Sequence, residues 1–163
     1  VLLGSVHWID EWLFDAYDTP AFARRWQGAE VDAVFDRYVD EVLALASSGL
    51  VDVLAHLDVI RVAGHRASEL AEHDHRLATG LAGSGLVIEV SSGGLRKPVA
   101  DIYPAPDLLR KLVDAGMTFT TASDGHDLDQ VGRGLDRVRE ELRGVGVDVL
   151  TTFDRRRPQS VPI

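Results

Sequence analysis

The sequence predicts a parallel α/β fold, because two kinds of segment alternate along it. Short apolar runs alternate with amphipathic stretches of helical length, which is typical of strands joined by crossover helices. The chain has 163 residues, enough for one domain with a sizeable core, and it contains no cysteine. An open doubly wound sheet and a closed βα barrel both fit the alternation. Neither a Gly-x-Gly-x-x-Gly segment nor a P-loop occurs, which disfavours the nucleotide-binding versions of the open sheet.

The first half of the chain contains two expected strands and two expected helices. A helix is expected at 31–46 because its apolar residues are spaced as one face of a helix, and Gly49 is expected to end it. For the next helix, Ser68 is the expected N-cap and Gly80 the stop. In order, we expect a strand at 2–6, an irregular excursion at 19–30, a helix at 31–46, a strand at 51–55 and a helix at about 68–79.

The second half continues the alternation. Pro106 is tolerated in the first turn of a helix, and Gly144 ends a stretch whose apolar residues, from Leu128 to Leu142, have helical spacing. The basic run 155–157 is expected to be a solvated tail. In order, we expect a strand at 86–90, a helix at 106–115, a strand at 117–122, a helix at about 128–143 and a strand at 147–153.

The charge balance narrows the classes of partner. The chain carries 17 basic and 26 acidic residues, a net charge of −9, which argues against broad binding of nucleic acid or anionic membranes. A small phosphorylated ligand remains compatible, because a local basic pocket can exist in an acidic protein. No apolar run approaches the ~20 residues of a membrane span, and the start does not resemble a signal peptide. We therefore expect a cytoplasmic protein without a membrane partner.

Chemically active side chains follow the expected strands. Because active sites of parallel α/β folds lie at the carboxyl ends of the strands, these side chains are expected to converge on one face. Imidazole and carboxylate donors without cysteine suit zinc, manganese or iron. The residues are His7 after the first strand, His56 and Asp58 after the second, Glu89 and Arg96 in and after the third, and Asp124 and His126 after the fourth.

Structural explanations exist for several of these residues. Glu89 lies inside a strand and could equally form an ion pair, Ser123 and Asp124 could cap the helix expected at 128, and Arg96 could be a surface loop residue. Other histidines are weaker candidates. His73 and His75 are two residues apart on an expected helix, so they point in different directions and cannot chelate one metal together.

Alternative chemistries have little support. We assign no role to His65, and the tryptophans at 8, 12 and 26 are expected to be core or pocket wall. No serine lies in a Gly-x-Ser-x-Gly elbow, which disfavours a serine hydrolase.

Four segments together resemble the polymerase and histidinol phosphatase (PHP) family. They are Gly-Ser-Val-His at 4–7, Ala-His-Leu-Asp at 55–58, the segment 89–96 followed by Tyr103-Pro104, and Ser-Asp-Gly-His at 123–126. They occur in the order found in that family, and the similarity is greatest to its stand-alone histidinol-phosphatase branch. Each motif is short, but the ordered set spans nearly the whole chain.

The resemblance implies a distorted seven-unit βα barrel, TIM-like, with a multinuclear metal site at its C-terminal face. It implies that His7, His56, Asp124 and His126 are metal ligands, with Asp124 and His126 also in the catalytic machinery. It implies that Arg61 and Arg96 hold the substrate phosphate, a task suited to the bidentate guanidinium.

The resemblance also implies that an N-terminal part of the family's domain is missing from these residues. The family begins with a His-x-His strand, a further His and a bridging Glu, none of which precedes 4–7 here. We therefore expect residues 1–163 to be the C-terminal portion of one PHP-type domain, with N-terminal barrel units missing and 151–163 forming the last strand and a tail. The alternative is a truncated chain that cannot build the whole site.

The implied function is metal-dependent hydrolysis of a small phosphomonoester, L-histidinol phosphate in histidine biosynthesis, through a metal-activated water. More than one divalent ion is expected in the complete protein. The alternatives are another phosphoesterase of the family, acting on nucleotide or nucleic-acid phosphodiesters, or a non-catalytic fragment with an incomplete metal site.

Overall fold

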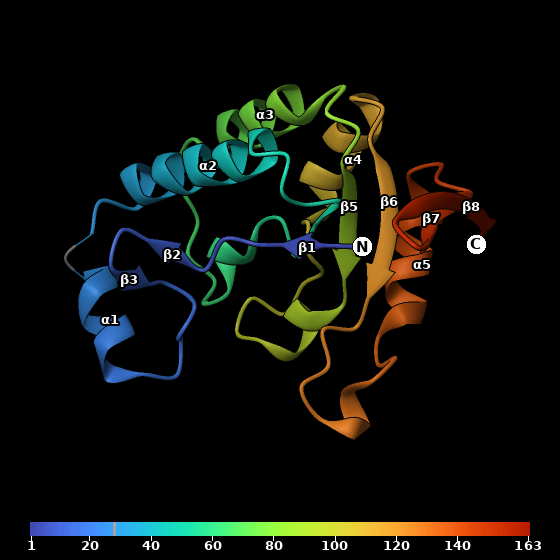
Figure 1. The fold of residues 1–163 in the computed structure, drawn as a ribbon. Helices are drawn as coiled ribbons and strands as arrows, with labels where there is room; N and C mark the ends of the chain where they lie inside the picture. Colours follow the sequence, from blue (N-terminus) through green and yellow to red (C-terminus); the bar gives the residue numbers. More distant parts are fainter. Residues whose placement is uncertain (28) are drawn as a thin grey trace.

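A four-stranded parallel sheet forms the centre of the molecule. The computed structural model describes residues 1–27 and 29–163. The strands β1 (Leu3–Gly4), β4 (Val53–Leu54), β5 (Val87–Ser91) and β6 (Thr118–Ala122) are neighbours in chain order, without reversal (Figure 1). The parallel α/β prediction is confirmed. The sheet is open rather than closed into a barrel, because β1 and β6 are its two edges.

Helices α2 (Val31–Ser47), α3 (Leu70–Leu81) and α4 (Pro106–Asp114) pack on one another in chain order (Figure 1). The apolar stripe of α2 is buried as predicted, at Phe35, Tyr38, Val39 and Val42. Fully burying a side chain of this size contributes about 1.5–3 kcal/mol. This stripe therefore fixes the helix against the core and, through it, the strand ends that carry the candidate site.

The start and end of α3 differ from the prediction. Ser68 does not cap the helix, because its hydroxyl donates to Asp32 of α2 at 2.7 Å. Gly80 lies inside the helix rather than stopping it. A Cβ at Gly80 would lie 2.6 Å from Cδ2 of Leu43, so α3 and α2 approach closely there and a larger residue would require the Leu43 side chain to shift.

The excursion expected at 19–30 contains a helix, so that prediction is wrong for most of its length. Helix α1 (Pro20–Gln27) buries Phe22 and Trp26, which are four residues apart and share one face. Thr19 accepts a hydrogen bond from the backbone N–H of Phe22 at 3.2 Å and so supplies an N-terminal cap. Gly28 lies outside the described residues.

A small hairpin that was not predicted precedes α1. Strands β2 (Trp8–Ile9) and β3 (Trp12–Leu13) pair antiparallel, with Ile9 and Trp12 facing the core. Trp12 and Trp26 are core residues, as expected, whereas Trp8 is exposed. The hairpin folds the chain back so that Asp15 lies beside His7.

The helix expected at about 128–143 begins only at 135. Leu128 and Val131 are 95% and 70% exposed, so their helical spacing does not reflect a buried face. Gly132 and Gly134 have φ of +77° and +78°, a left-handed conformation that interrupts an α-helix. Residues 128–130 form a single 3-10 turn, and α5 runs over Leu135–Gly144.

The last expected parallel strand is instead part of a C-terminal hairpin. Strand β7 (Val149–Asp154) pairs antiparallel with β8 (Arg157–Pro162). Arg155 and Arg156 form the two-residue turn with φ of +48° and +66°, which matches the right-handed twist of a hairpin. Arg156 donates to both carboxylate oxygens of Asp52 at 2.8 and 3.0 Å. The run 155–157 is therefore part of a hairpin and not a solvated tail.

One buried carboxyl group gives a pH-dependent stability prediction. Asp74 of α3 is 7% exposed, and burial, reinforced by Asp58, raises its pKa to about 6. Because the folded protein then binds more protons than the unfolded chain between about pH 4 and 6, stability falls as the pH rises through this window. We expect Asp74→Asn to raise the free energy of unfolding by up to about 3 kcal/mol at pH 7 and to change it little at pH 4.

Urea titrations of wild type and Asp74→Asn at both pH values measure this difference. An equal effect of the substitution at pH 4 and pH 7 would show that ionisation of Asp74 is not its cause.

Among residues 1–27 and 29–163, no helix combines the length and the apolar character that a membrane crossing requires.

Candidate active site

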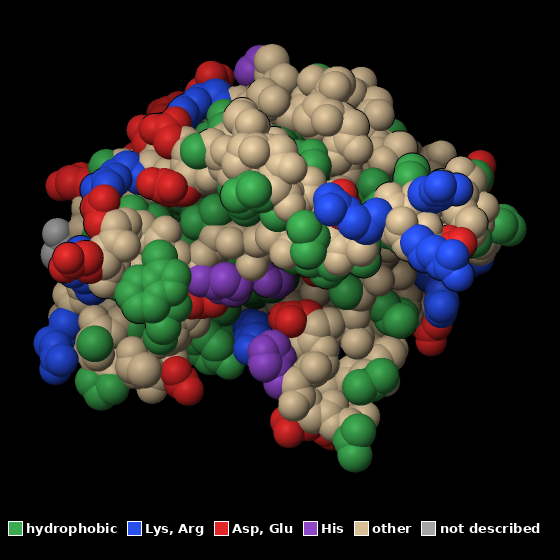
Figure 2. All heavy atoms as spheres, in the orientation of Figure 1, with side chains coloured by type: hydrophobic (Ala, Val, Ile, Leu, Met, Phe, Trp, Pro, Cys, Tyr) green, Lys and Arg blue, Asp and Glu red, His purple; other side chains and the backbone are tan. Residues whose placement is uncertain are grey.

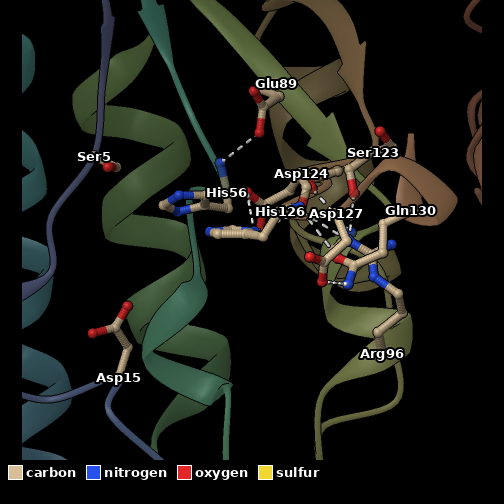
Figure 3. A network of polar contacts seen from close by, with 12 residues as sticks. Ser5, Asp15, His56, Glu89, Arg96, Ser123, Asp124, His126, Asp127 and Gln130 are labelled. Atoms are coloured by element: carbon tan, nitrogen blue, oxygen red, sulfur yellow. Dashed lines mark hydrogen bonds and ion pairs between the residues drawn. The ribbon is translucent and has the colours of Figure 1, made fainter. Parts of the chain in front are cut away.

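The chemically active side chains gather at the carboxyl edge of the sheet. Figure 2 shows histidines beside a hollow on this face, with acidic and basic side chains around it. His56, Glu89, Asp124 and His126 converge in Figure 3, where Ser5 and Asp15 lie on the other side of His56. The prediction that strand ends deliver these residues to one face thus agrees with the structure.

His7 follows β1 and has a partner at each ring nitrogen. Its Nδ1 lies 2.6 Å from Oδ2 of Asp15, and its Nε2 lies 2.8 Å from the hydroxyl of Ser5. The carboxylate accepts a hydrogen bond from Nδ1–H, so Nε2 of the neutral ring accepts one from the Ser5 hydroxyl. This hydrogen bond to Asp15 raises the pKa of His7. The rings of His7 and His56 meet edge to face with centroids 5.0 Å apart.

His56 lies two residues after the end of β4 and has φ of +30°, in the left-handed region that side chains seldom adopt. Its Nδ1 is buried and has no hydrogen-bond partner in the part of the chain that the structure describes. Burial and the neighbouring His7 lower the pKa of His56. The ring is therefore neutral near pH 7, the form in which imidazole binds a metal.

Glu89 of β5 supports His56 through the backbone. Its Oε1 accepts the N–H of His56 at 3.3 Å, and its side chain is 4% exposed. Burial raises the pKa of Glu89 to about 7. No ion pair to Glu89 is found within 1–27 and 29–163, so the ion-pair explanation left open by the sequence receives no support.

Asp124 and His126 follow β6 on a tight turn. Asp124 has φ of +48°, and its carboxylate lies over Gly93, where a Cβ would be 2.6 Å from Oδ2. His126 is exposed, and its Nδ1 lies 3.1 Å from the carbonyl oxygen of Asp124. Because α5 begins only at Leu135, the alternative of a helix-capping turn at 123–124 is wrong.

The two candidate arginines have different surroundings. The half-buried Arg96 donates from Nη2 to the carbonyl oxygens of Ser123 and Asp124, at 2.7 and 2.9 Å. It is therefore not merely a surface loop residue. Arg61 is buried, 2.7 Å from Asp58, and donates to the carbonyl oxygen of Ile102 at 3.2 Å. None of these contacts of Arg61 reaches the histidines, so the structure brings Arg96 to the cluster and places Arg61 in a buried network with Asp58.

The other histidines have structural surroundings. His73 is buried and its Nε2 lies 3.0 Å from Asp36, whereas His75 is exposed. His65 stacks on Trp26 with ring centroids 4.1 Å apart. None of them joins the cluster.

The donor types fit a metal in part. The unpartnered, buried Nδ1 of His56 and the space that Gly93 leaves for the Asp124 carboxylate are the observations in favour. Imidazole and carboxylate donors suit zinc, manganese and iron. However, no group of three histidine or acidic side chains in the described ranges could hold a metal ion by itself. The donors at this edge therefore do not form a complete metal site among the described residues.

The sequence of the chain is similar to that of a named protein. The chain is 34% identical over 155 residues to a Deinococcus radiodurans protein named "Probable histidinol-phosphatase". The match covers 95% of this chain and 58% of that protein, so the chain spans less than two thirds of its relative's length. No family model matches the chain.

A solved structure shares the fold. It is the histidinol phosphate phosphatase of Lactococcus lactis subsp. lactis Il1403, in complex with zinc, L-histidinol and phosphate. The match has a TM-score of 0.73 and 17% sequence identity, and it covers 96% of this chain and 60% of that one. This likeness places the chain in the same mixed α/β fold with a parallel sheet.

The sequence did not reveal Ser5 and Asp15 as partners of His7. Asp15 is eight residues further along and reaches His7 only because the β2–β3 hairpin reverses the chain. Two-residue strands give too short a pattern to be detected, so no signal in the sequence pointed to this pair.

Proposed function

We propose that this chain is part of a metal-dependent phosphomonoester hydrolase that releases phosphate from L-histidinol phosphate in histidine biosynthesis. The observation that carries the proposal is the convergence of His7, His56 and Asp124 at one sheet edge, with Arg96 holding the Asp124 turn. The named function of the Deinococcus relative and the ligands in the Lactococcus structure support it.

The metal-ligand role falls to His7, His56, Asp124 and His126. When bound, divalent zinc, manganese or iron would supply a nucleophilic water at neutral pH and neutralise charge on the phosphoryl group. Asp15 fixes the tautomer of His7 so that Nε2 carries the lone pair, which accepts from Ser5 in this structure and would be donated to a bound metal. Burial keeps His56 neutral, and Glu89 holds its backbone. Arg96 remains a proposed phosphate contact, whereas the buried contacts of Arg61 with Asp58 and Ile102 favour a structural role for that residue.

The proposal includes a longer domain. The four strands in unreversed order fit one sector of the distorted βα barrel, with 1–163 as the C-terminal portion of one PHP-type domain. Further strands would pair with the open edges, and further ligands would complete the coordination shell of more than one metal. Within this view the protein acts in the cytoplasm on a small phosphorylated substrate, and not on nucleic acid or at a membrane.

The test is phosphate release by the protein expressed from its complete coding sequence and loaded with zinc or manganese. L-histidinol phosphate is compared with a nucleoside monophosphate and with a phosphodiester. Clear preference for L-histidinol phosphate supports the proposal. Preference for the diester or nucleotide favours another phosphoesterase, and inactivity of the metal-loaded protein favours a non-catalytic domain.

A second candidate chemistry rests on one observation. Ser5, His7 and Asp15 form a hydrogen-bonded chain in which the serine hydroxyl meets Nε2 and the carboxylate meets Nδ1. This is the order of a nucleophile, base and orienting group. The variant Ser5→Ala distinguishes a serine nucleophile from the metal mechanism. Under the metal mechanism turnover stays near wild type, whereas a serine nucleophile predicts a loss of about 10⁶-fold.

The contact between Asp15 and His7 gives a further prediction. A carboxylate that orients a metal-binding imidazole typically contributes 10–100-fold to metal affinity or activity. We expect Asp15→Asn to weaken zinc binding of the complete protein by about this factor, measured by competition with a chromophoric chelator. Asp18→Asn, nearby and exposed, is the control. Equal zinc affinity of Asp15→Asn and wild type would contradict the role.

A further inference from the structure

The segment after β5 contacts the Asp124 turn at several points. It forms the 3-10 helix η2 (Gly93–Arg96), preceded by Ser92. Gly93 provides the space for the Asp124 carboxylate, and the Ser92 hydroxyl donates to the carbonyl oxygen of Arg133 at 2.6 Å. Together with the hydrogen bonds of Arg96, these contacts hold both ends of the loop between β6 and α5.

The turn itself needs this support. Asp124 carries a side chain at φ of +48°, a conformation that costs free energy and persists only where the surroundings enforce it. Ser123 helps by accepting the N–H of Gly132 at 3.0 Å. The strained position is the one that aims the candidate ligand, so whatever enforces it also sets the direction of the carboxylate.

Arg96 has the geometry to enforce the left-handed conformation of Asp124. One nitrogen, Nη2, donates to two successive carbonyl oxygens, those of Ser123 and Asp124, which fixes the peptide between them (Figure 3). Nη1 is buried and makes no hydrogen bond to the described residues. Through Nη2 the guanidinium is directed at the backbone of the turn. A lysine ammonium at the end of a flexible stem lacks this planar, preorganised arrangement.

We propose that Arg96 is a positioning residue, which holds the Asp124 turn in its left-handed conformation and so determines metal affinity and turnover. This role goes beyond a phosphate contact and rests on the proposed function. Gly93 acts from the other side by leaving the carboxylate its space. Loss of either contact lets the carboxylate turn away from His56.

The test compares Arg96→Lys, Arg96→Gln and Gly93→Ala in the complete protein, after circular dichroism has shown that each folds. The matched control is Arg110→Gln, an exposed arginine of α4. The readouts are the affinity and visible absorption spectrum of bound Co²⁺, the inhibition constant of inorganic phosphate, and kcat and KM separately. Gly93→Ala is decisive because it disturbs Asp124 without removing a guanidinium.

All three variants are expected to weaken Co²⁺ binding and lower kcat by about 10–100-fold, with an altered Co²⁺ spectrum. In Gly93→Ala, which keeps the guanidinium, KM and the phosphate inhibition constant stay close to wild type. A raised KM and phosphate inhibition constant in the Arg96 variants, with an unchanged Co²⁺ spectrum, would overturn the inference and leave Arg96 as a phosphate contact. Wild-type behaviour of all three variants would also overturn it.

The same measurements distinguish failure of the proposed function from failure of the positioning role of Arg96. If the wild-type protein binds Co²⁺ but releases no phosphate, the proposed function fails, and weaker Co²⁺ binding by the variants still supports the positioning role. If wild type is active and the variants keep their Co²⁺ spectrum, the inference fails and the function stands. Absence of Co²⁺ binding by wild type overturns the positioning role, and phosphate release by the zinc-loaded protein then decides the proposed function.

Discussion

Replacing His56 or Asp124 with alanine is expected to abolish phosphate release by the complete protein and to lower its metal content. His56 is the most buried imidazole of the cluster, and burial and its neighbour His7 keep it neutral. Asp124 is the carboxylate that Gly93 and Arg96 hold against the cluster. Removing one preorganised stabilising group costs about 10²–10³-fold in kcat, and a lost ligand should cost at least as much.

The measurement combines metal content per chain with turnover of L-histidinol phosphate. His75→Ala is the matched control, because that histidine lies exposed on α3, away from the cluster. If either substitution left both turnover and metal content intact, the strand-end cluster would not be the active site. Loss of metal with wild-type turnover would separate the metal from the chemistry.

Long periodic segments were the part of the fold that could be predicted. The stripe of α2 predicted a helix at 31–46, and the structure has it at Val31–Ser47, because sixteen or so residues average out local exceptions. The same reasoning failed at Leu128 and Val131. Their spacing is helical, but Gly132 and Gly134 take left-handed conformations and no core faces that segment.

Short elements could not be predicted. The β2–β3 hairpin has two residues in each strand, and the β7–β8 turn is made by Arg155 and Arg156, neither of which is a typical turn residue. Whether a strand is parallel or antiparallel also depends on the strand with which it pairs. The run at 147–153 predicts a strand, but only its pairing with β8 shows that it is antiparallel and outside the central sheet.

The candidate site could be predicted where the order and direction of the strands determine which residues meet. Parallel strands present their carboxyl ends at one edge, so His7, His56 and Asp124 converge without any knowledge of side-chain packing. Contacts that depend on packing were not predictable. Asp15 reaches His7 through a chain reversal, and Arg96 turns toward the backbone of Ser123 and Asp124. The sequence indicates which residues meet, while their hydrogen-bond partners follow from the three-dimensional packing.

Arg61 gives the second large prediction, because its surroundings favour a structural role. It is 4% exposed and pairs with Asp58, which is 5% exposed, and its Nη1 lies 3.8 Å from Asp101. Arg61→Ala leaves the Asp58 carboxylate buried without its cation. Removing one partner of a buried pair costs about 3–5 kcal/mol, so we expect a loss of this size in the free energy of unfolding at pH 7.

The pH dependence identifies the cause of that loss. Burial raises the pKa of Asp58 and Arg61 opposes this effect, so without Arg61 the pKa rises further. A group with a raised pKa in the folded state costs stability only above its ordinary pKa, so the deficit should shrink as the pH falls toward 4.

The double variant Asp58→Asn/Arg61→Met should recover much of the stability, since Asn still accepts from Ala105 while no unpaired charge remains. Urea unfolding midpoints of the single and double variants test this directly. A stable Arg61→Ala protein with a raised KM would instead assign Arg61 to the substrate phosphate, because a residue free to bind a ligand is not needed to neutralise a buried carboxylate.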